Sequence, residues 1–120
     1  MENTIEKLNF GDVVYVDFGE IDGITHCQRG LRPAVVLTNK NILEHGNSPI
    51  LQVIPISTSN KNKKFHVYLD EEVLNEKSFA LPEQVTTIDK NQVLNIRGHL
   101  SETSLLKIKK AVYKQMALYL

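Results

Sequence analysis

The chain has a single cysteine, Cys27, so no disulfide can form within it, and we expect the cytoplasm to be its compartment. It has no run of about 18 apolar residues, which excludes a continuous membrane-spanning helix, and we expect no membrane partner. The first nine residues carry Glu2 and Glu6 and lack an apolar stretch, so we expect no secretory signal.

The chain also lacks a net charge at pH 7, because 14 Lys and Arg residues balance 14 Asp and Glu residues. Proteins that coat nucleic acid are usually basic, so this total does not favour that class. The distribution is uneven, however: residues 60–66 contain no acid and hold Lys61, Lys63, Lys64 and His66. A local basic rim in a neutral chain is typical of a site that holds a few phosphates, and a solvated surface loop is the alternative.

The chain also lacks alternating strand and helix units and a glycine-rich phosphate loop before a helix. Short apolar segments instead predict strands at 13–18, 34–38, 50–56, 65–69, 79–82, 85–88 and 92–100. Ser101 is expected to cap a C-terminal helix whose apolar face carries Leu105, Ile108, Val112 and Met116. We therefore expect one mainly β domain over residues 1–120, a small curled barrel with a helix against it.

The most distinctive pattern is Gly30-Leu31-Arg32-Pro33 in front of an apolar segment. The proline fixes its own φ and favours an extended conformation for the residue before it, so Arg32 is expected at a rigid strand entrance. Gly30 can adopt a positive φ at no steric cost. An arginine held in this way loses few rotamers when it binds a phosphate or a carboxylate.

Polar side chains also stand at the ends of other predicted strands. Ser57 and Thr58 follow one apolar segment, and Glu83 with Gln84 lies between two more. Strand ends on one rim of a barrel lie near each other, so a cation, a hydroxyl and a carboxylate can converge there. Alternatively, Arg32 forms an ion pair with an acid and residues 57–59 are ordinary turn residues. The pattern alone leaves both interpretations open.

Five landmarks, in order over residues 11–118, resemble the MazF/PemK family of toxins from bacterial toxin–antitoxin systems. They are Gly11-Asp12-Val13-Val14-Tyr15-Val16-Asp17, Gln28-x-Gly30-x-Arg32-Pro33, Pro55-Ile56-Ser57-Thr58, Glu83-Gln84-Val85-x-Thr87-Ile88-Asp89-Lys90 and Leu100-Ser101. The resemblance implies an SH3-like barrel that cleaves single-stranded mRNA without a metal or another cofactor. In this chemistry the RNA 2′-OH attacks the adjacent phosphate and leaves a 2′,3′-cyclic phosphate and a 5′-OH.

The resemblance also implies residue roles. Arg32 matches the catalytic arginine of the family, Ser57 matches a hydroxyl position usually held by threonine, and Glu83 matches an acidic position near the scissile 2′-OH. Thr58 is the alternative source of the hydroxyl. Contacts with RNA bases and phosphates are expected from Phe18, His26, Gln28, Arg29, Thr58, Lys61, Lys63, Lys64 and Gln84.

Two positions depart from the family pattern. Cys27 stands where members often carry glutamate, and Thr86 stands where many carry arginine. These departures leave open a non-enzymatic alternative, similar to the CcdB-like gyrase poisons, which share the fold and bind a protein. The partners that the resemblance implies are single-stranded mRNA, a cognate antitoxin protein, a second copy of the chain in a homodimer and, through the antitoxin, operator DNA.

Overall fold

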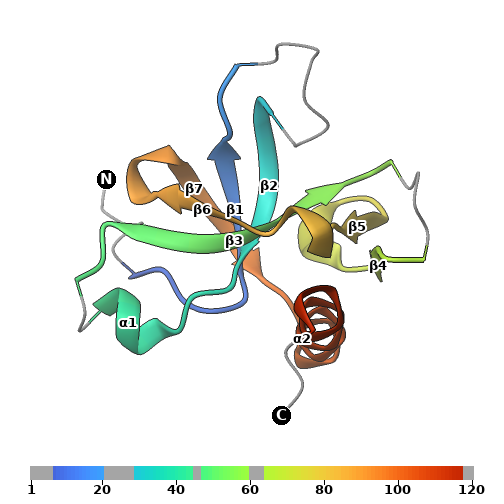
Figure 1. Ribbon diagram of the computed structural model, residues 1–120. Helices are drawn as coiled ribbons and strands as arrows, with labels where there is room; N and C mark the ends of the chain where they lie inside the picture. Colours follow the sequence, from blue (N-terminus) through green and yellow to red (C-terminus); the bar gives the residue numbers. More distant parts are fainter. Residues whose placement is uncertain (1–6, 21–28, 45–46, 60–63, 118–120) are drawn as a thin grey trace.

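The computed structural model describes residues 7–20, 29–44, 47–59 and 64–117 of the chain. Within them lie seven strands, two α-helices and several short 3-10 turns (Figure 1). The strands and helices are β1 (Asp12–Asp17), β2 (Leu31–Val36), α1 (Lys40–Glu44), β3 (Ile50–Ser57), β4 (Val67–Leu69), β5 (Ser78–Ala80), β6 (Thr86–Asp89), β7 (Val93–His99) and α2 (Glu102–Met116). The prediction of a mainly β fold with a C-terminal helix is therefore confirmed.

The strands form one antiparallel sheet in the order β4-β5-β3-β2-β1-β7, and β6 pairs with β3 outside this path. Within the described residues, β4 and β7 at the ends of the path do not pair with each other. The sheet is thus curled, as the sequence predicts, but its two ends are not joined by strand pairing within the described residues. Strand β3 pairs with β6 through residues 50–53 and with β5 through Ile56 and Ser57.

Pro55 lies where β3 changes partner. A proline within a strand usually marks an edge or a bulge, but β3 is central and pairs with β2 on its other side, where Pro55 is opposite Ala34. A proline has no N–H to donate to the sheet, and Pro55 falls between the residues that pair with β6 and those that pair with β5. Its carbonyl accepts a hydrogen bond from Leu81 N at 3.0 Å, which brings the turn Pro82–Gln84 against β3.

Successive residues of the central strands face two separate buried clusters. In β1, Val13 packs in the cluster that contains α2, and Val14 packs in the cluster that contains α1. The three apolar residues 34–36 of β2 are all fully buried, as expected for a strand covered on both faces. The α1 cluster contains Leu8, Val14, Val16, Ala34, Val36, Leu43, Leu51, Val53, Ile88 and Val93. The α2 cluster contains Val13, Val35, Ile54, Ile56, Val67, Leu69, Ala80, Leu100, Leu105 and Ile108.

Helix α2 begins as the sequence predicts. The Ser101 hydroxyl accepts a hydrogen bond from Ser104 N at 3.2 Å, which is the geometry of an N-cap. Leu105 and Ile108 are buried, and Val112 is partly buried against the same cluster. Met116 is 45% exposed, so the prediction of a buried face is wrong for the last turn of the helix. Within the described residues, no helix combines the length and the apolar character needed to cross a membrane.

Candidate active site

Arg32 is the second residue of β2, in the extended conformation that the following proline favours. The segment before it is closed by two backbone hydrogen bonds: Phe18 N donates to Gly30 O at 2.8 Å, and Gly30 N donates to Gly19 O at 2.7 Å. Gly30 has φ +81°, in the left-handed region, as its place in the loop predicts. The Arg32 Nε donates to the carbonyl of Arg29 at 3.0 Å, which orients the guanidinium.

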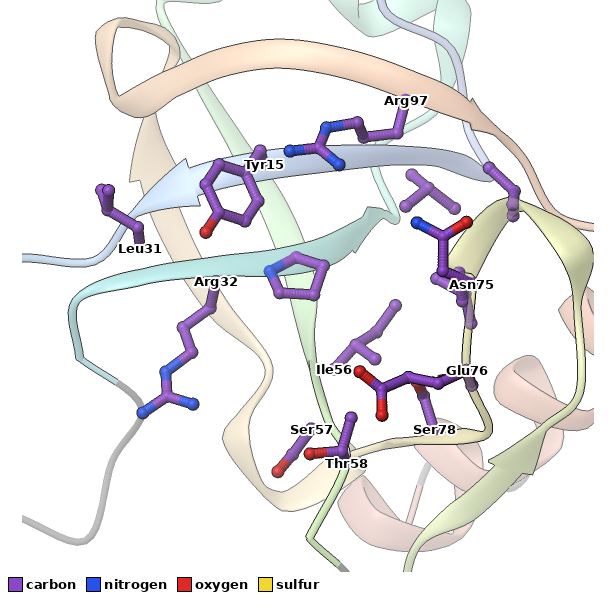
Figure 2. A pocket seen from close by; sticks show the side chains of 14 residues that line it. Tyr15, Leu31, Arg32, Ile56, Ser57, Thr58, Asn75, Glu76, Ser78 and Arg97 are labelled. Atoms are coloured by element: carbon purple, nitrogen blue, oxygen red, sulfur yellow. Dashed lines mark hydrogen bonds between the residues drawn. The ribbon is translucent and has the colours of Figure 1, made fainter.

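Arg32 lines a hollow of about 200 Å³, called the first hollow from here on (Figure 2). Two of the predicted site residues, Ser57 and Thr58, lie on its wall. Ser57 is half-buried, and its hydroxyl oxygen accepts a hydrogen bond from Ser59 N at 3.0 Å. This contact is typical of a turn, which agrees with the alternative that residues 57–59 are ordinary turn residues. It still leaves the Ser57 O–H able to donate to a ligand.

The first hollow also contains polar side chains that sequence reasoning did not select: Tyr15, Asn75, Glu76, Ser78 and Arg97. Tyr15 comes from β1 and Arg97 from β7, while Asn75 and Glu76 follow a 3-10 turn that precedes β5. No described carboxylate forms an ion pair with Arg32, so the alternative of a simple structural ion pair has no support within the described residues. Arg32 thus lines a hollow without a described ion-pair partner.

Glu83 is not in the first hollow. It lines a second hollow of about 470 Å³, together with Phe18, Arg29, Gln84 and Thr86. The turn Pro82–Gln84 packs against Pro55, and Pro55 lines the second hollow whereas Ile56 and Ser57 line the first. Arg32 and Glu83 therefore line two different hollows, both of which border β3. The expected convergence of cation, hydroxyl and carboxylate on one rim is therefore found only for Arg32 with Ser57 and Thr58.

The Glu83 carboxylate contacts a histidine instead. His66 Nε2 and Glu83 Oε2 are 2.9 Å apart. The His66 side chain is only 6% exposed, whereas that of Glu83 is 32% exposed. The histidine therefore lies beneath the carboxylate and limits the directions in which Glu83 can point.

Lys64 lies in a third hollow of about 640 Å³, between the segment before β4 and the helix lysines Lys107, Lys110 and Lys114. It is therefore grouped with the basic face of α2 and not with Arg32. His26, Gln28, Lys61 and Lys63, which were also predicted to contact RNA, lie outside the described residues, as does Cys27. No group of three or more His, Cys, Asp or Glu side chains able to hold a metal ion occurs in the described part of the chain.

Comparison with known proteins gives a consistent result. The family described as "PemK-like, MazF-like toxin of type II toxin-antitoxin system" matches residues 9–116. No curated protein matches the sequence. Among solved structures, MazF from Deinococcus radiodurans is similar with a TM-score of 0.78 and 19% identity, over 92% of this chain and 96% of that chain.

Two similar structures contain a second protein. An endoribonuclease in complex with its cognate antitoxin, from a mycobacterial species, has a TM-score of 0.74 and 15% identity, with 95% of this chain and 97% of that chain covered. A MazE–MazF structure from Deinococcus radiodurans has a TM-score of 0.75 and 19% identity, with 94% and 98% covered. At these identities the structural likeness establishes the fold, and the match over residues 9–116 establishes the family.

Proposed function

Because the chain belongs to the PemK-like, MazF-like family of type II toxins, a family of RNA-cleaving enzymes, we propose that it cleaves single-stranded mRNA at a phosphate bound in the first hollow. The observation that carries this proposal is the placement of Arg32 beside Ser57 and Thr58, with no described carboxylate paired to the guanidinium. A cation and a hydroxyl in one small hollow suit a phosphate that gains negative charge during reaction.

The proposed reaction uses the RNA's own nucleophile. The 2′-oxygen forms a bond to phosphorus and loses its proton, while the bond from phosphorus to the 5′-oxygen breaks and that oxygen gains a proton. The products are a 2′,3′-cyclic phosphate and a 5′-OH. Arg32 stabilises the charge that develops on the non-bridging oxygens, and the hydroxyl of Ser57 or Thr58 orients one of them.

The second hollow is proposed to receive the nucleotides next to the cut. Phe18 offers an aromatic face for stacking a base, and Gln84 and Arg29 offer amide and guanidinium groups to base edges or phosphates. Glu83 is proposed to contact the substrate there, held by His66, and not to act beside Arg32. Thr86, where many family members carry arginine, removes one cation from this hollow.

We also propose further properties of the protein from its family resemblance. They are activity without a metal, sequence-specific cleavage, a homodimer in the cytoplasm, inhibition by a cognate antitoxin protein and, through that antitoxin, binding to operator DNA. The solved neighbours in complex with an antitoxin support the antitoxin partner.

Incubation of the purified protein with a labelled single-stranded RNA in EDTA tests the proposal. We expect fragments that end in a 2′,3′-cyclic phosphate, and no cut where the nucleotide 5′ to the scissile bond is 2′-deoxy. Arg32→Ala should lower the rate by about 10²–10³-fold, the usual effect of removing one stabiliser of a charged transition state. Lys40→Ala is the matched control, since Lys40 is exposed on α1, 3.9 Å from Glu44.

Ser57→Ala and Thr58→Ala, measured in the same assay, identify the hydroxyl that acts, because only one of them should approach the loss seen for Arg32→Ala. Full activity of Arg32→Ala would refute the proposed site. If the wild type cuts no RNA and its expression arrests growth with mRNA intact, the protein-binding alternative is favoured instead.

A further inference from the structure

Arg97 and Tyr15 form a stacked pair on the wall of the first hollow (Figure 2). The guanidinium carbon of Arg97 lies 4.6 Å from the centre of the Tyr15 ring. The Arg97 Nε donates a hydrogen bond to Asn95 Oδ1 at 2.8 Å, and Asn95 is the residue opposite Tyr15 in the pairing of β1 with β7. Two residues on adjacent strands, Tyr15 and Asn95, thus hold the Arg97 guanidinium in place.

These contacts use one face and one nitrogen of the Arg97 guanidinium. Its terminal amino groups have no hydrogen-bond partner among the described residues, and no described carboxylate pairs with it. The side chain is exposed. An arginine that is already oriented by stacking loses little conformational freedom on binding, so it is better prepared for an anion than a mobile surface arginine.

The charges of the first hollow also favour an anion. Its described lining holds two guanidinium groups, Arg32 and Arg97, and one carboxylate, Glu76. In Figure 2 the two guanidinium groups lie on opposite sides of Tyr15, so they can contact two different groups of one ligand. An RNA backbone carries a phosphate at every nucleotide, so a strand that places one phosphate at Arg32 must bring the next one nearby.

We propose that Arg97, stacked on Tyr15, binds the backbone phosphate adjacent to the scissile phosphate, with Tyr15 against the sugar or base between them. This inference rests on the proposed ribonuclease function and adds a substrate-binding residue to it. Arg97 contributes to holding the strand, whereas Arg32 stabilises the reacting phosphate. Loss of Arg97 therefore weakens RNA binding and leaves the rate of the bound complex nearly unchanged.

The test separates binding from chemistry. A fluorescent RNA containing the mapped cleavage site, with a 2′-deoxy nucleotide that prevents cutting, reports Kd by anisotropy. The corresponding all-RNA strand reports the single-turnover rate at saturation. For Arg97→Ala we expect Kd to rise about tenfold, because one charge-assisted contact is lost. The slope of log Kd against log salt should fall by about 0.7, and the saturating rate should stay within about threefold of wild type.

Lys109→Ala is the matched control. Lys109 Nζ lies 5.0 Å from the centre of the Phe10 ring, so this variant also removes a cation from an aromatic face. Lys109 and Phe10 line a hollow other than the first hollow, so the Lys109→Ala variant should bind and cleave RNA like the wild type. Arg97→Lys keeps the charge without the planar fork and should fall between wild type and Arg97→Ala. Arg97→Gln, with its melting temperature compared to wild type, separates a binding defect from unfolding.

Three results would overturn the inference while the ribonuclease function stands, as shown by an active wild type and an inactive Arg32→Ala. One is an Arg97→Ala variant with unchanged Kd and salt slope. The second is a lower saturating rate with Kd unchanged, which would assign Arg97 to the chemistry. The third is weaker binding of an acidic test peptide with RNA binding intact, which would make the pair a protein-binding surface. A wild type that cuts no RNA would instead refute the proposed function.

Discussion

Glu71, between β4 and the turn Glu72–Leu74, joins a distant part of the chain to the start of α2. Its carboxylate accepts hydrogen bonds from Ser101 N at 3.3 Å, from the Ser101 hydroxyl at 2.7 Å and from the Ser104 hydroxyl. Burial acts to raise the pKa of Glu71, but these hydrogen bonds outweigh it and lower the pKa from its ordinary value of 4.5. A carboxylate at a helix N-terminus is also favoured by the helix dipole.

Glu71→Gln should lower the free energy of unfolding by about 1–2 kcal/mol at pH 7. Hydrogen bonds to a charged acceptor contribute about 1.5–3 kcal/mol, and glutamine keeps one neutral acceptor oxygen in nearly the same place. Partial exposure of the site to solvent reduces the loss further. The pKa of Glu71 is lower in the folded state, so its contribution is complete above about pH 4.5 and is lost as pH falls through the folded pKa.

Urea denaturation of wild type and Glu71→Gln between pH 7 and pH 3.5 measures this effect. We expect a constant difference from pH 7 to about pH 5, which then shrinks as Glu71 becomes protonated. Glu72→Gln is the control, since Glu72 is the next residue, is exposed and forms no described side-chain hydrogen bond. An unchanged stability of Glu71→Gln at pH 7, or a difference that grows toward low pH, would refute the reasoning.

Further predictions concern packing and the His66 contact. Gly98→Ala should destabilise the fold by about 1–3 kcal/mol in urea titrations, because a Cβ there would lie 2.5 Å from Val73 Cγ2, and Val73→Ala should restore part of the loss. Ile54→Ala, at a fully buried site, should cost about 2–5 kcal/mol in the same titration, and a loss below about 1 kcal/mol would contradict the described core. His66→Ala should lower stability more than His66→Gln, because glutamine can still donate to Glu83; equal losses would show that the 2.9 Å contact contributes nothing.

Local chemistry made part of the site predictable from the sequence. Pro33 restricts Arg32 whatever surrounds it, and Gly30 marks a backbone position with positive φ, so the strand entrance could be inferred from three residues. Ser101 with an apolar stripe behind it likewise predicted the start of α2. These features depend on contacts between residues close in the sequence.

The rest of the site depends on how distant strands pair. Arg97 meets Tyr15 only because β7 pairs with β1 in one register, and that pairing spans about 80 residues of sequence. The only indication of this contact in the sequence is that Arg97 is the one Lys, Arg, Asp or Glu residue in the segment 93–99. Glu83 was expected beside Arg32 but lines the second hollow instead, because the turn Pro82–Gln84 packs where β3 changes partner at Pro55. No spacing in the sequence indicates that change.

The two buried clusters share the same strands, and this has a consequence for cooperativity. Val13 and Val14 are neighbours in β1 but pack in different clusters, and β2 divides its residues in the same way. Neither cluster can be exposed without breaking the backbone pairing that supports the other. Unfolding should therefore be a single all-or-none transition, in which tyrosine fluorescence and helical circular dichroism change together with denaturant.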